Sequence, residues 1–238
     1  MNDLTREVRA SYDAYEFHPI SHSISNFCTT ELSKLYIDIT KDRVYTGRAD
    51  GQPRRSAQTA MYFVLSGLVR LLAPMISFTA EEMWQAIPHS AADNKESVFL
   101  NDMPSFDEAL TYPALAEKWN SLFEMRDDVM KALEIARADK LVGKSLEAKI
   151  TIYTQDAQIR ALLDSFGDEL TTVFIVSGVK LSSDNAPESA YVNEENTLAV
   201  LVEPADGCKC DRCWSFSTKG EDDGEGGFIC ARCREILK

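Results

Sequence analysis

The chain has 238 residues, of which 45% are hydrophobic and 26% are charged, and its formal net charge is −13 at pH 7. This composition is that of an ordinary folded protein and excludes a collagen-like or wholly disordered chain. The acidic balance argues against a protein that coats nucleic acid by bulk charge. No apolar run reaches the roughly 18 residues of a membrane span, and the N-terminus lacks the hydrophobic core of a secretory signal, so we expect a cytoplasmic protein.

Residues 3–137 have the apolar periodicity of helices, with one long interruption. A segment with two glycines and a proline, residues 46–53, predicts a loop between two of these helices. The helix after this loop presents an apolar stripe made of Met61, Leu65, Leu68 and Leu72. Pro74 is expected to end or kink that helix. Several helices that each bury such a stripe form a bundle.

The next helix is expected to begin at a capping box, Thr79-x-x-Glu82. Residues 88–115 contain three prolines and lose the helical period, which predicts a connector that wraps the bundle. The period then returns in a further helix, whose stripe consists of Trp119, Leu122, Arg126, Val129, Leu133 and Ala136.

After Gly143 the apolar period changes to two, which is typical of strands. Apolar and polar residues alternate from Ala148 to Ile152, and a short helix is expected around Leu162. Two apolar segments predict buried strands: TTVFIVSG (171–178) and TLAVLVEP (197–204). Residues 144–206 are therefore expected to form a small α+β unit.

Five of the six cysteines lie in the last 31 residues, where Cys210-x2-Cys213 and Cys230-x2-Cys233 are separated by sixteen residues. In a reducing compartment two such motifs predict four thiolates around one structural zinc ion. The alternative is a redox pair of the thioredoxin kind, which needs only one such motif beside a βαβ pattern. Cys208 is interpreted as a free neighbour of the zinc site.

Two groups of basic residues interrupt the acidic background. Residues 41–70 carry six basic residues and two acids; the basic ones are Lys41, Arg43, Arg48, Arg54, Arg55 and Arg70. In the cysteine-rich tail, Trp214 lies beside Lys209 and Arg212. An indole that stacks on a base, with cations for phosphate, suits single-stranded RNA. The alternatives are a solvated helix face in the first group and packing of Trp214 against the cysteine motif.

No catalytic motif is present in the sequence: it lacks a phosphate-binding G-x-x-x-x-G-K-[ST] loop, a G-x-G-x-x-G motif, a G-x-S-x-G elbow and an H-E-x-x-H motif. The three histidines are His18, His22 and His89. No third ligand completes a metal site with His18 and His22, so these two are interpreted as surface or core residues. We assign no catalytic residue.

Two long segments resemble the anticodon-binding helical region of class I aminoacyl-tRNA synthetases: YEFHPISHSISNFCTTELSKLYIDITKDRVY (15–45) and RRSAQTAMYFVLSGLVRLLAPMISFTAEEMWQAIP (54–88). Within them, ELSKLYIDITKDRVY and LLAPMISFTAEE resemble the isoleucyl-tRNA synthetases of the bacterial type. ALEIARADKLVGKSLEAKI and the KCDRCW and CARC motifs are similar to the next stretch and the C-terminal zinc knuckle of that family.

The resemblance implies a mainly α fold with three parts: an anticodon-binding bundle (1–143), the small α+β unit (144–206) and a four-cysteine zinc ribbon (207–238). The nucleotide-binding and editing domains of the family lie upstream, and their HIGH-type and KMSKS-type signatures do not occur here. We therefore expect a C-terminal fragment that binds the anticodon arm of isoleucine tRNA. The expected partners are this tRNA and the catalytic portion of the parent chain, which attaches isoleucine to tRNA with ATP; no membrane is expected.

The resemblance also implies roles for single residues. The implied zinc ligands are Cys210, Cys213, Cys230 and Cys233, and the implied tRNA contacts are Lys41, Arg43, Arg54, Arg55, Lys209, Arg212 and Trp214. Arg54 and Arg55 could instead tie helices together. The acidic segment 220–226 departs from the family pattern, and we expect it to face away from RNA because it would repel phosphate.

Two rival interpretations come from other classes of protein. A DNA-repair glycosylase can carry a similar double knuckle at its C-terminus, but it needs an N-terminal Pro-Glu, and this chain opens Met1-Asn2-Asp3. A zinc-dependent scaffold for protein partners would fit the net acidity and would ignore tRNA at low salt.

Overall fold

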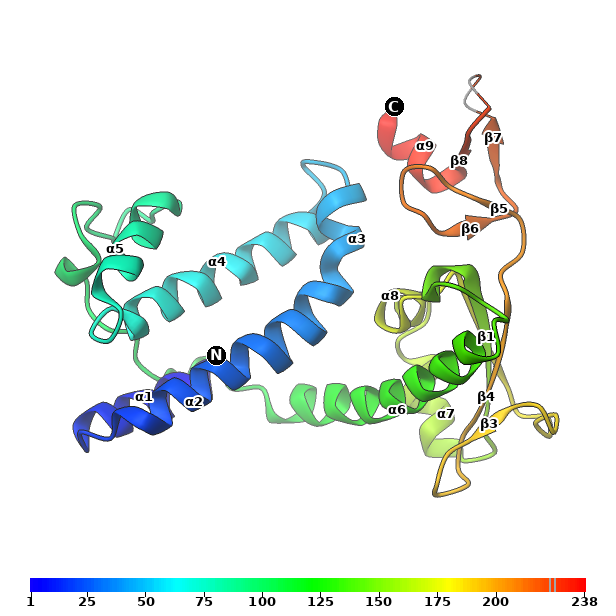
Figure 1. Ribbon diagram of the computed structural model, residues 1–238, viewed down its shortest axis with the longest axis horizontal. Coiled ribbons are helices and arrows are strands. Elements are labelled where there is room, and N and C mark those ends of the chain that lie inside the picture. Colours follow the sequence, from blue (N-terminus) through cyan, green and yellow to red (C-terminus); the bar gives the residue numbers. More distant parts are fainter. Residues whose placement is uncertain (223, 225) are drawn as a thin grey trace. The chain divides into compact units, whose positions relative to one another are not determined.

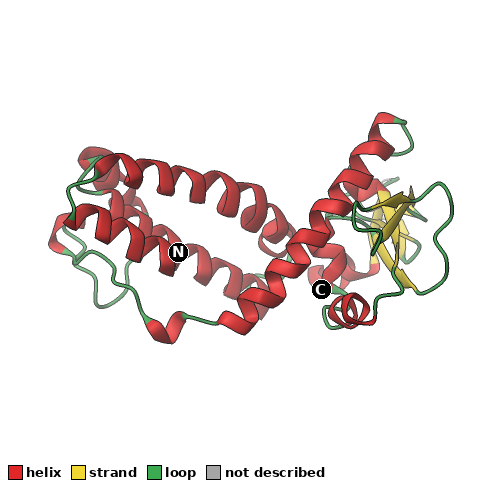
Figure 2. Cartoon of the chain, turned by 90° about the horizontal axis from the view of Figure 1, so that it is seen from below, coloured by secondary structure: helices red, strands yellow, loops and turns green. Residues whose placement is uncertain are grey.

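The computed structural model describes residues 1–222, 224 and 226–238, and it divides into two compact units, Met1–Thr111 and Tyr112–Lys238. Among the described residues, the strands all belong to the second unit (Figure 2). The predicted fold class, mainly α with a small α+β part and a cysteine-rich tail, is confirmed. The division at residues 143 and 206 stays a prediction. The acidic segment 220–226 lies in part outside the described residues.

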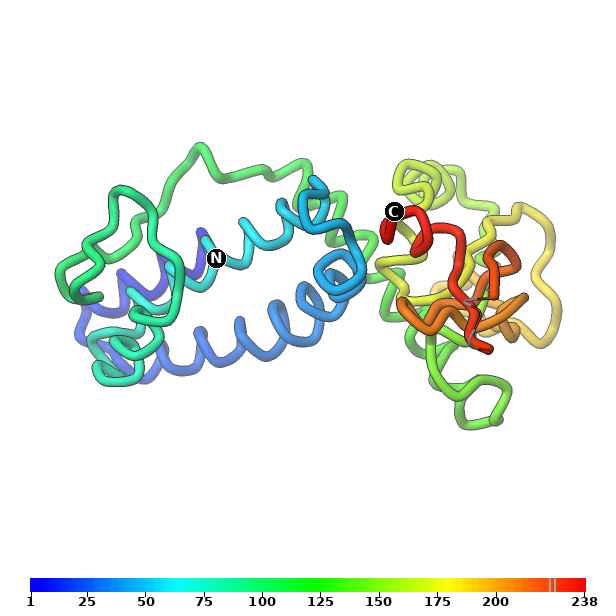
Figure 3. The backbone as a smooth tube through the Cα atoms, turned by 90° about the horizontal axis from the view of Figure 1, so that it is seen from above, coloured from blue at the N-terminus to red at the C-terminus, as the bar shows by residue number. Residues whose placement is uncertain are grey.

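The first unit consists of helices and a long connector. Its main helical elements are α1 (Asn2–Asp13), α2 (Phe17–Asn26), η1 (Phe27–Ile37), α3 (Asp38–Thr46), α4 (Gln52–Leu72) and α5 (Ser77–Ala86). α2, η1 and α3 form one continuous helix, since the residues at both junctions keep right-handed helical backbone angles, and η1 is its π-helical middle part. α4 returns beside this helix (Figures 1 and 3), and the Tyr36 hydroxyl donates to the Ala57 carbonyl at 3.3 Å between the two.

Two apolar clusters hold the first unit together. The larger one joins α1, α2, the start of η1 and α4, and its buried members are Leu4, Val8, Ile20, Ile24, Phe27, Leu68 and Leu71. The smaller one joins the end of α4 to α5 and a short helical turn, η2 (Val98–Leu100), around the fully buried Trp84. Apolar burial on this scale is the main source of stability for a helical unit.

The predicted loop and proline break are confirmed, since α3 ends at Thr46, α4 begins at Gln52 and α4 ends two residues before Pro74. The predicted capping box is wrong. α5 begins at Ser77 rather than after Thr79, and no side chain caps its first turn. The Ser77 hydroxyl donates to the Ala73 carbonyl at 3.0 Å, which links the first residue of α5 to the turn after α4.

The predicted connector is irregular chain with two short helical turns, η2 and η3 (Glu108–Leu110), but its predicted end is wrong, because residues 113–115 already belong to the next helix. It runs from α5 back to α1. At its far end, the Asn2 side chain donates to the Asp107 carbonyl at 2.8 Å and accepts from the Asp107 amide at 3.0 Å. The connector is thus tied to the first helix of its own unit.

The second unit packs helices on a small mixed sheet. Its elements before the tail are α6 (Pro113–Ala138), η4 (Ser145–Glu147), β1 (Ala148–Tyr153), α7 (Ala157–Asp164), α8 (Glu169–Phe174), β2 (Gly178–Ser182), β3 (Tyr191–Val192) and β4 (Ala199–Pro204). The strand order is β2-β1-β4-β3, with β1 parallel to β2 and antiparallel to β4. α6 buries its predicted stripe here except for Trp119, which is half-buried, and the buried Arg126 donates from Nε to the Val173 carbonyl at 2.9 Å.

One predicted strand is wrong. Residues 171–178 begin inside α8, and only β2, from Gly178, is extended. Val173 and Phe174 are buried residues of α8. In the sequence, a short apolar run of this kind looks the same whether it forms a buried helix or a buried strand. Ile175, at φ +56°, ends that helix in the left-handed conformation. The strand predicted at 197–204 is confirmed as β4.

The tail is built from two hairpins and a helix: β5 (Cys208–Lys209), β6 (Phe216–Ser217), β7 (Gly220–Asp222), β8 (Phe228–Cys230) and α9 (Ala231–Leu237). The Phe216 amide donates to the Ser177 hydroxyl at 2.8 Å, which ties the first hairpin to the start of β2. Across the described residues, none of the helices combines the length and the apolar character that a membrane crossing requires.

Candidate functional site: a four-cysteine metal centre and two basic groups

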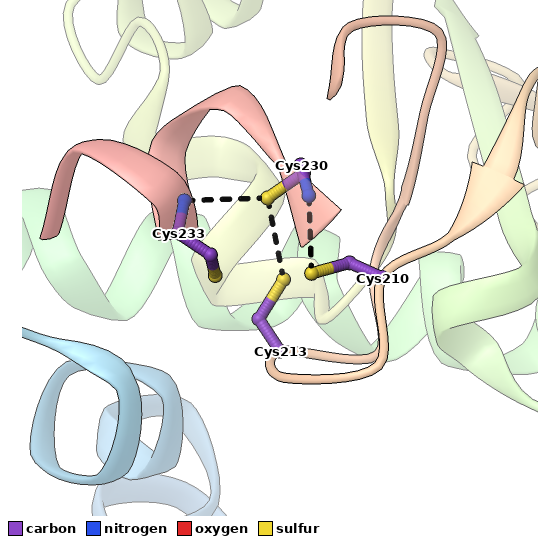
Figure 4. A group of neighbouring side chains, drawn as sticks. All are labelled: Cys210, Cys213, Cys230 and Cys233. Atoms are coloured by element: carbon purple, nitrogen blue, oxygen red, sulfur yellow. Dashed lines mark hydrogen bonds between the residues drawn. The ribbon is translucent and has the colours of Figure 1, made fainter. Parts of the chain in front are cut away.

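Four cysteine thiols meet in the tail (Figure 4). Cys210 and Cys213 belong to the turn between β5 and β6, Cys230 ends β8, and Cys233 lies in the first turn of α9. All four are buried, and their sulfur atoms all lie within 4.8 Å of one another. This cluster could hold a metal ion.

The distances between the sulfur atoms fit a metal ion in tetrahedral coordination. Metal–sulfur bonds of about 2.3 Å in a tetrahedron place the sulfurs about 3.8 Å apart, and the Cys213 and Cys230 sulfurs are 3.8 Å apart. The backbone holds the ligands in place, since the Cys230 amide donates to the Cys210 sulfur at 3.3 Å and the Cys233 amide to the Cys230 sulfur at 3.5 Å. Four sulfur ligands leave no open position, so such a site is structural rather than catalytic.

The thiols ionise unequally without a metal. Burial by itself would raise the pKa of Cys210, but hydrogen bonds from backbone amides, first that of Cys230, lower it to about 6. Burial raises the pKa of Cys230, and it raises that of Cys233 to about 12. Four adjacent thiolates at neutral pH therefore require a bound cation.

Arg212 has a structural contact that its predicted role did not include. Its Nη1 atom donates to the Cys233 sulfur at 3.6 Å, across the cluster from its own motif. A cation beside a ligand sulfur reduces the negative charge that the cluster accumulates, as outer contacts of metal ligands do. Arg212 thus contacts the cluster itself, and it remains a predicted tRNA contact.

Trp214 is 61% exposed, so most of its side chain faces solvent and only part of it can pack against the cysteine motif. Its φ of +64° is left-handed, and its amide donates to the Cys210 carbonyl at 2.8 Å, which closes the turn and directs the indole outward. The Lys209 ammonium lies 5.8 Å from the centre of its ring. The structure thus brings these two predicted contacts together.

The predicted basic residues of the first unit lie on α3 and on the first turn of α4. Lys41 is exposed, and its hydrogen bond to Asp38, at 2.8 Å, raises the pKa of its ammonium group. Arg43 is half-buried on the same helix. These two residues remain predicted contacts.

Arg54 and Arg55 are neighbours with different surroundings. Arg54 is half-buried, its Nη1 atom donates to the Gly47 carbonyl at 3.5 Å, and its Nε atom is buried without a partner among the described residues. Gly47 itself allows no side chain, since a Cβ there would lie 2.5 Å from the Arg43 carbonyl oxygen. Arg54 thus braces the α3–α4 loop. Arg55 is exposed, and its guanidinium makes no hydrogen bond or ion pair with the part of the chain that is described.

A groove beside Arg55 was not predicted from the sequence. It has a volume of about 570 Å³ and is lined by Ala49, Arg55, Gln58, Thr59, Tyr62, Pro88, His89 and Ser90. No motif could have revealed it, because its walls come from α4, the loop before it and the chain after α5. His18 and His22 lie on the surface, in line with the sequence interpretation.

Comparison with known proteins shows two kinds of similarity. Residues 1–152 match the model of a family described as the anticodon-binding domain of tRNA ligase. The chain is 43% identical over 240 residues to an isoleucine--tRNA ligase of Caldanaerobacter subterraneus subsp. tengcongensis, covering 100% of this chain and 26% of the relative. Isoleucine--tRNA ligases of Syntrophotalea carbinolica and Bacillus cereus are 42% and 41% identical, again over 100% of the chain and 25% of the relative. The chain thus spans about a quarter of the length of these curated relatives.

Proposed function

The chain belongs to the family of anticodon-binding domains of tRNA ligases, and from this membership we propose that it binds the anticodon arm of isoleucine tRNA. The observation that carries the proposal is the family match over residues 1–152, and the full-length similarity to isoleucine--tRNA ligases supports the choice of tRNA. In the parent enzyme this binding would hold the tRNA while a catalytic portion attaches isoleucine with ATP. We also propose that the protein is cytoplasmic.

The chain contributes two contact surfaces to this proposal. On the first unit, Lys41, Arg43 and Arg55 would bind phosphate groups, with Arg54 supporting the loop between their helices. On the tail, the exposed indole of Trp214 would stack on an unpaired base, with Lys209 beside it. Because phosphate contacts are local, they are compatible with a net charge of −13.

We propose that the metal in the cysteine cluster is one zinc ion, held by Cys210, Cys213, Cys230 and Cys233. The sulfur spacing supports this choice, since zinc accepts four thiolates in a closed tetrahedron. The ion would keep the turn that carries Trp214 in shape. It supplies no chemistry to a reaction.

Fluorescence anisotropy with a labelled anticodon stem–loop of isoleucine tRNA tests RNA binding. The wild-type chain is expected to bind at low salt and to lose affinity as salt rises, because phosphate contacts release counterions. Arg55→Gln should weaken binding by about tenfold, the effect of one charge-assisted contact of about 1.4 kcal/mol, and lower the salt slope by about one. Lys131→Gln on α6 is the matched control. No binding by the wild-type chain at low salt would refute the proposal and favour the scaffold interpretation.

A further inference from the structure

The groove beside Arg55 has the chemistry of a nucleotide site. Its volume of about 570 Å³ lies within the range of small-molecule sites. Two aromatic rings, Tyr62 and His89, line it together with three uncharged polar side chains, Gln58, Thr59 and Ser90. Every part of the groove belongs to the first unit, so its form depends on that unit alone.

Arg55 gives the groove its positive charge. Its guanidinium has neither a hydrogen bond nor an ion pair with the residues that are described. By contrast, the Arg54 guanidinium donates to the Gly47 carbonyl, and that of Arg48 pairs with Asp50. A guanidinium with five unused donors suits a phosphate group, which it can bind in bidentate geometry. The groove therefore joins an anion contact to flat aromatic surfaces.

The aromatic wall is already held in place. The His89 ring packs on the buried indole of Trp84, with the ring centres 4.7 Å apart, and its Nδ1 atom is buried without a partner among the described residues. The Tyr62 hydroxyl donates to Asp93 Oδ2 at 3.1 Å, and the Ser90 amide donates to the same oxygen at 2.7 Å. Since these side chains are fixed before any ligand arrives, binding would cost little ordering entropy.

We propose that this groove is a nucleotide subsite that takes one unstacked nucleotide of the bound RNA. The phosphate of that nucleotide binds Arg55, its base lies against Tyr62 and His89, and Gln58 or Thr59 donates to the base edge. This inference rests on the proposed RNA binding and deepens it. An unstacked base on an aromatic surface, with an arginine at its phosphate, is the common arrangement for single-stranded RNA.

A titration with uridine 5′-monophosphate tests the groove separately from RNA binding. The chain has three histidines, so three imidazole signals report the site in a carbon–proton NMR spectrum. We expect the nucleotide to shift the His89 signal and to leave those of His18 and His22 in place. Uridine and inorganic phosphate should each bind at least threefold more weakly than the nucleotide. Equal shifts at all three histidines, no shift at His89, or equal binding of phosphate alone would overturn the proposal.

Variants then connect the groove to RNA. Tyr62→Leu should weaken binding of the stem–loop RNA by about fivefold to a hundredfold, the range for loss of one stacked base. Arg55→Gln should weaken the mononucleotide as well, which a purely structural role of this exposed residue would not do. Phe78→Leu is the matched control, since Phe78 is an aromatic residue of the same unit, 94% exposed and outside the groove. Urea unfolding of each variant confirms that its fold is retained.

The outcomes separate the two proposals. If the wild-type chain does not bind the stem–loop RNA, the proposed function fails and this inference with it. If it binds, and Tyr62→Leu behaves as Phe78→Leu does, the groove is not a nucleotide subsite and the proposed function stands.

Discussion

Replacement of one ligand cysteine tests how the tail is held together. Cys233→Ser removes one of four sulfurs from the cluster and leaves the chain otherwise unchanged. Among the described residues of the tail, only the four cysteines are buried, and Phe228 and Ile229 are the partly buried side chains that pack on them. Two partly buried apolar side chains supply at most about 3–6 kcal/mol, so the metal must supply most of the tail's folding free energy.

The expected size of the effect follows from the ligand count. Zinc binding to small four-ligand modules contributes about 10–16 kcal/mol of apparent free energy, or roughly 2.5–4 kcal/mol for each ligand. Loss of one thiolate should therefore weaken zinc binding by roughly 10²- to 10³-fold. Competition with a colorimetric chelator measures that affinity. Limited trypsin digestion measures whether the tail, which is rich in lysine and arginine, has unfolded.

Cys208→Ser is the matched control, because Cys208 is exposed, lies two residues from Cys210 and stands outside the cluster. It should leave both the zinc affinity and the digestion pattern unchanged. The reasoning is refuted if the metal-free chain keeps its tail protected from trypsin, or if the two variants lose zinc to the same extent.

Two further predictions concern packing and pH. Arg126→Leu should lower the free energy of unfolding by about 1–3 kcal/mol in urea, because the Val173 carbonyl loses its buried partner, and Arg126→Lys should recover part of this; an unchanged midpoint would contradict the role of the contact. Burial alone would raise the pKa of Asp93, but hydrogen bonds, first that from the Ser90 amide, lower it below its ordinary value of 3.8. Its contribution to stability is therefore complete above pH 3.8 and is lost as pH falls through the lowered pKa. Acid titrations followed by circular dichroism should show a smaller loss of stability in Asp93→Asn than in the wild type. Identical profiles would show that Asp93 does not contribute to the pH dependence of stability.

The cysteine cluster could be predicted because its ligands come as close pairs along the chain. The two residues between Cys210 and Cys213 already place both sulfurs on one side of a turn, and the second pair repeats this at the start of α9. Long helices such as α4 and α6 could be predicted equally well, since their apolar period persists over several turns.

Other features depend on tertiary structure. The run that contains Val173 and Phe174 has no period long enough to distinguish a helix from a buried strand, so its neighbours decide. Arg54 and Arg55 look alike in sequence, yet consecutive residues of a helix point about 100° apart, and one braces a loop while the other lines a groove. Tyr62 and His89 line the same groove only because the chain after α5 brings His89 back to α4.

The π-helical segment between α2 and α3 sets the angular position, around the helix axis, of the basic side chains at the end of this long helix. A π turn contains more residues than an α turn, so each residue after Ile37 takes a different angular position from the one that a regular α-helix would give it. Deletion of a single residue within Phe27–Ile37 that restored α-helical geometry there would change the angular position of Lys41 and Arg43 around the axis relative to Ile20 and Ile24. The composition of the helix would barely change, but each of its two cationic side chains would point in a new direction. The number of residues in this segment therefore determines the direction in which the Lys41 and Arg43 side chains point.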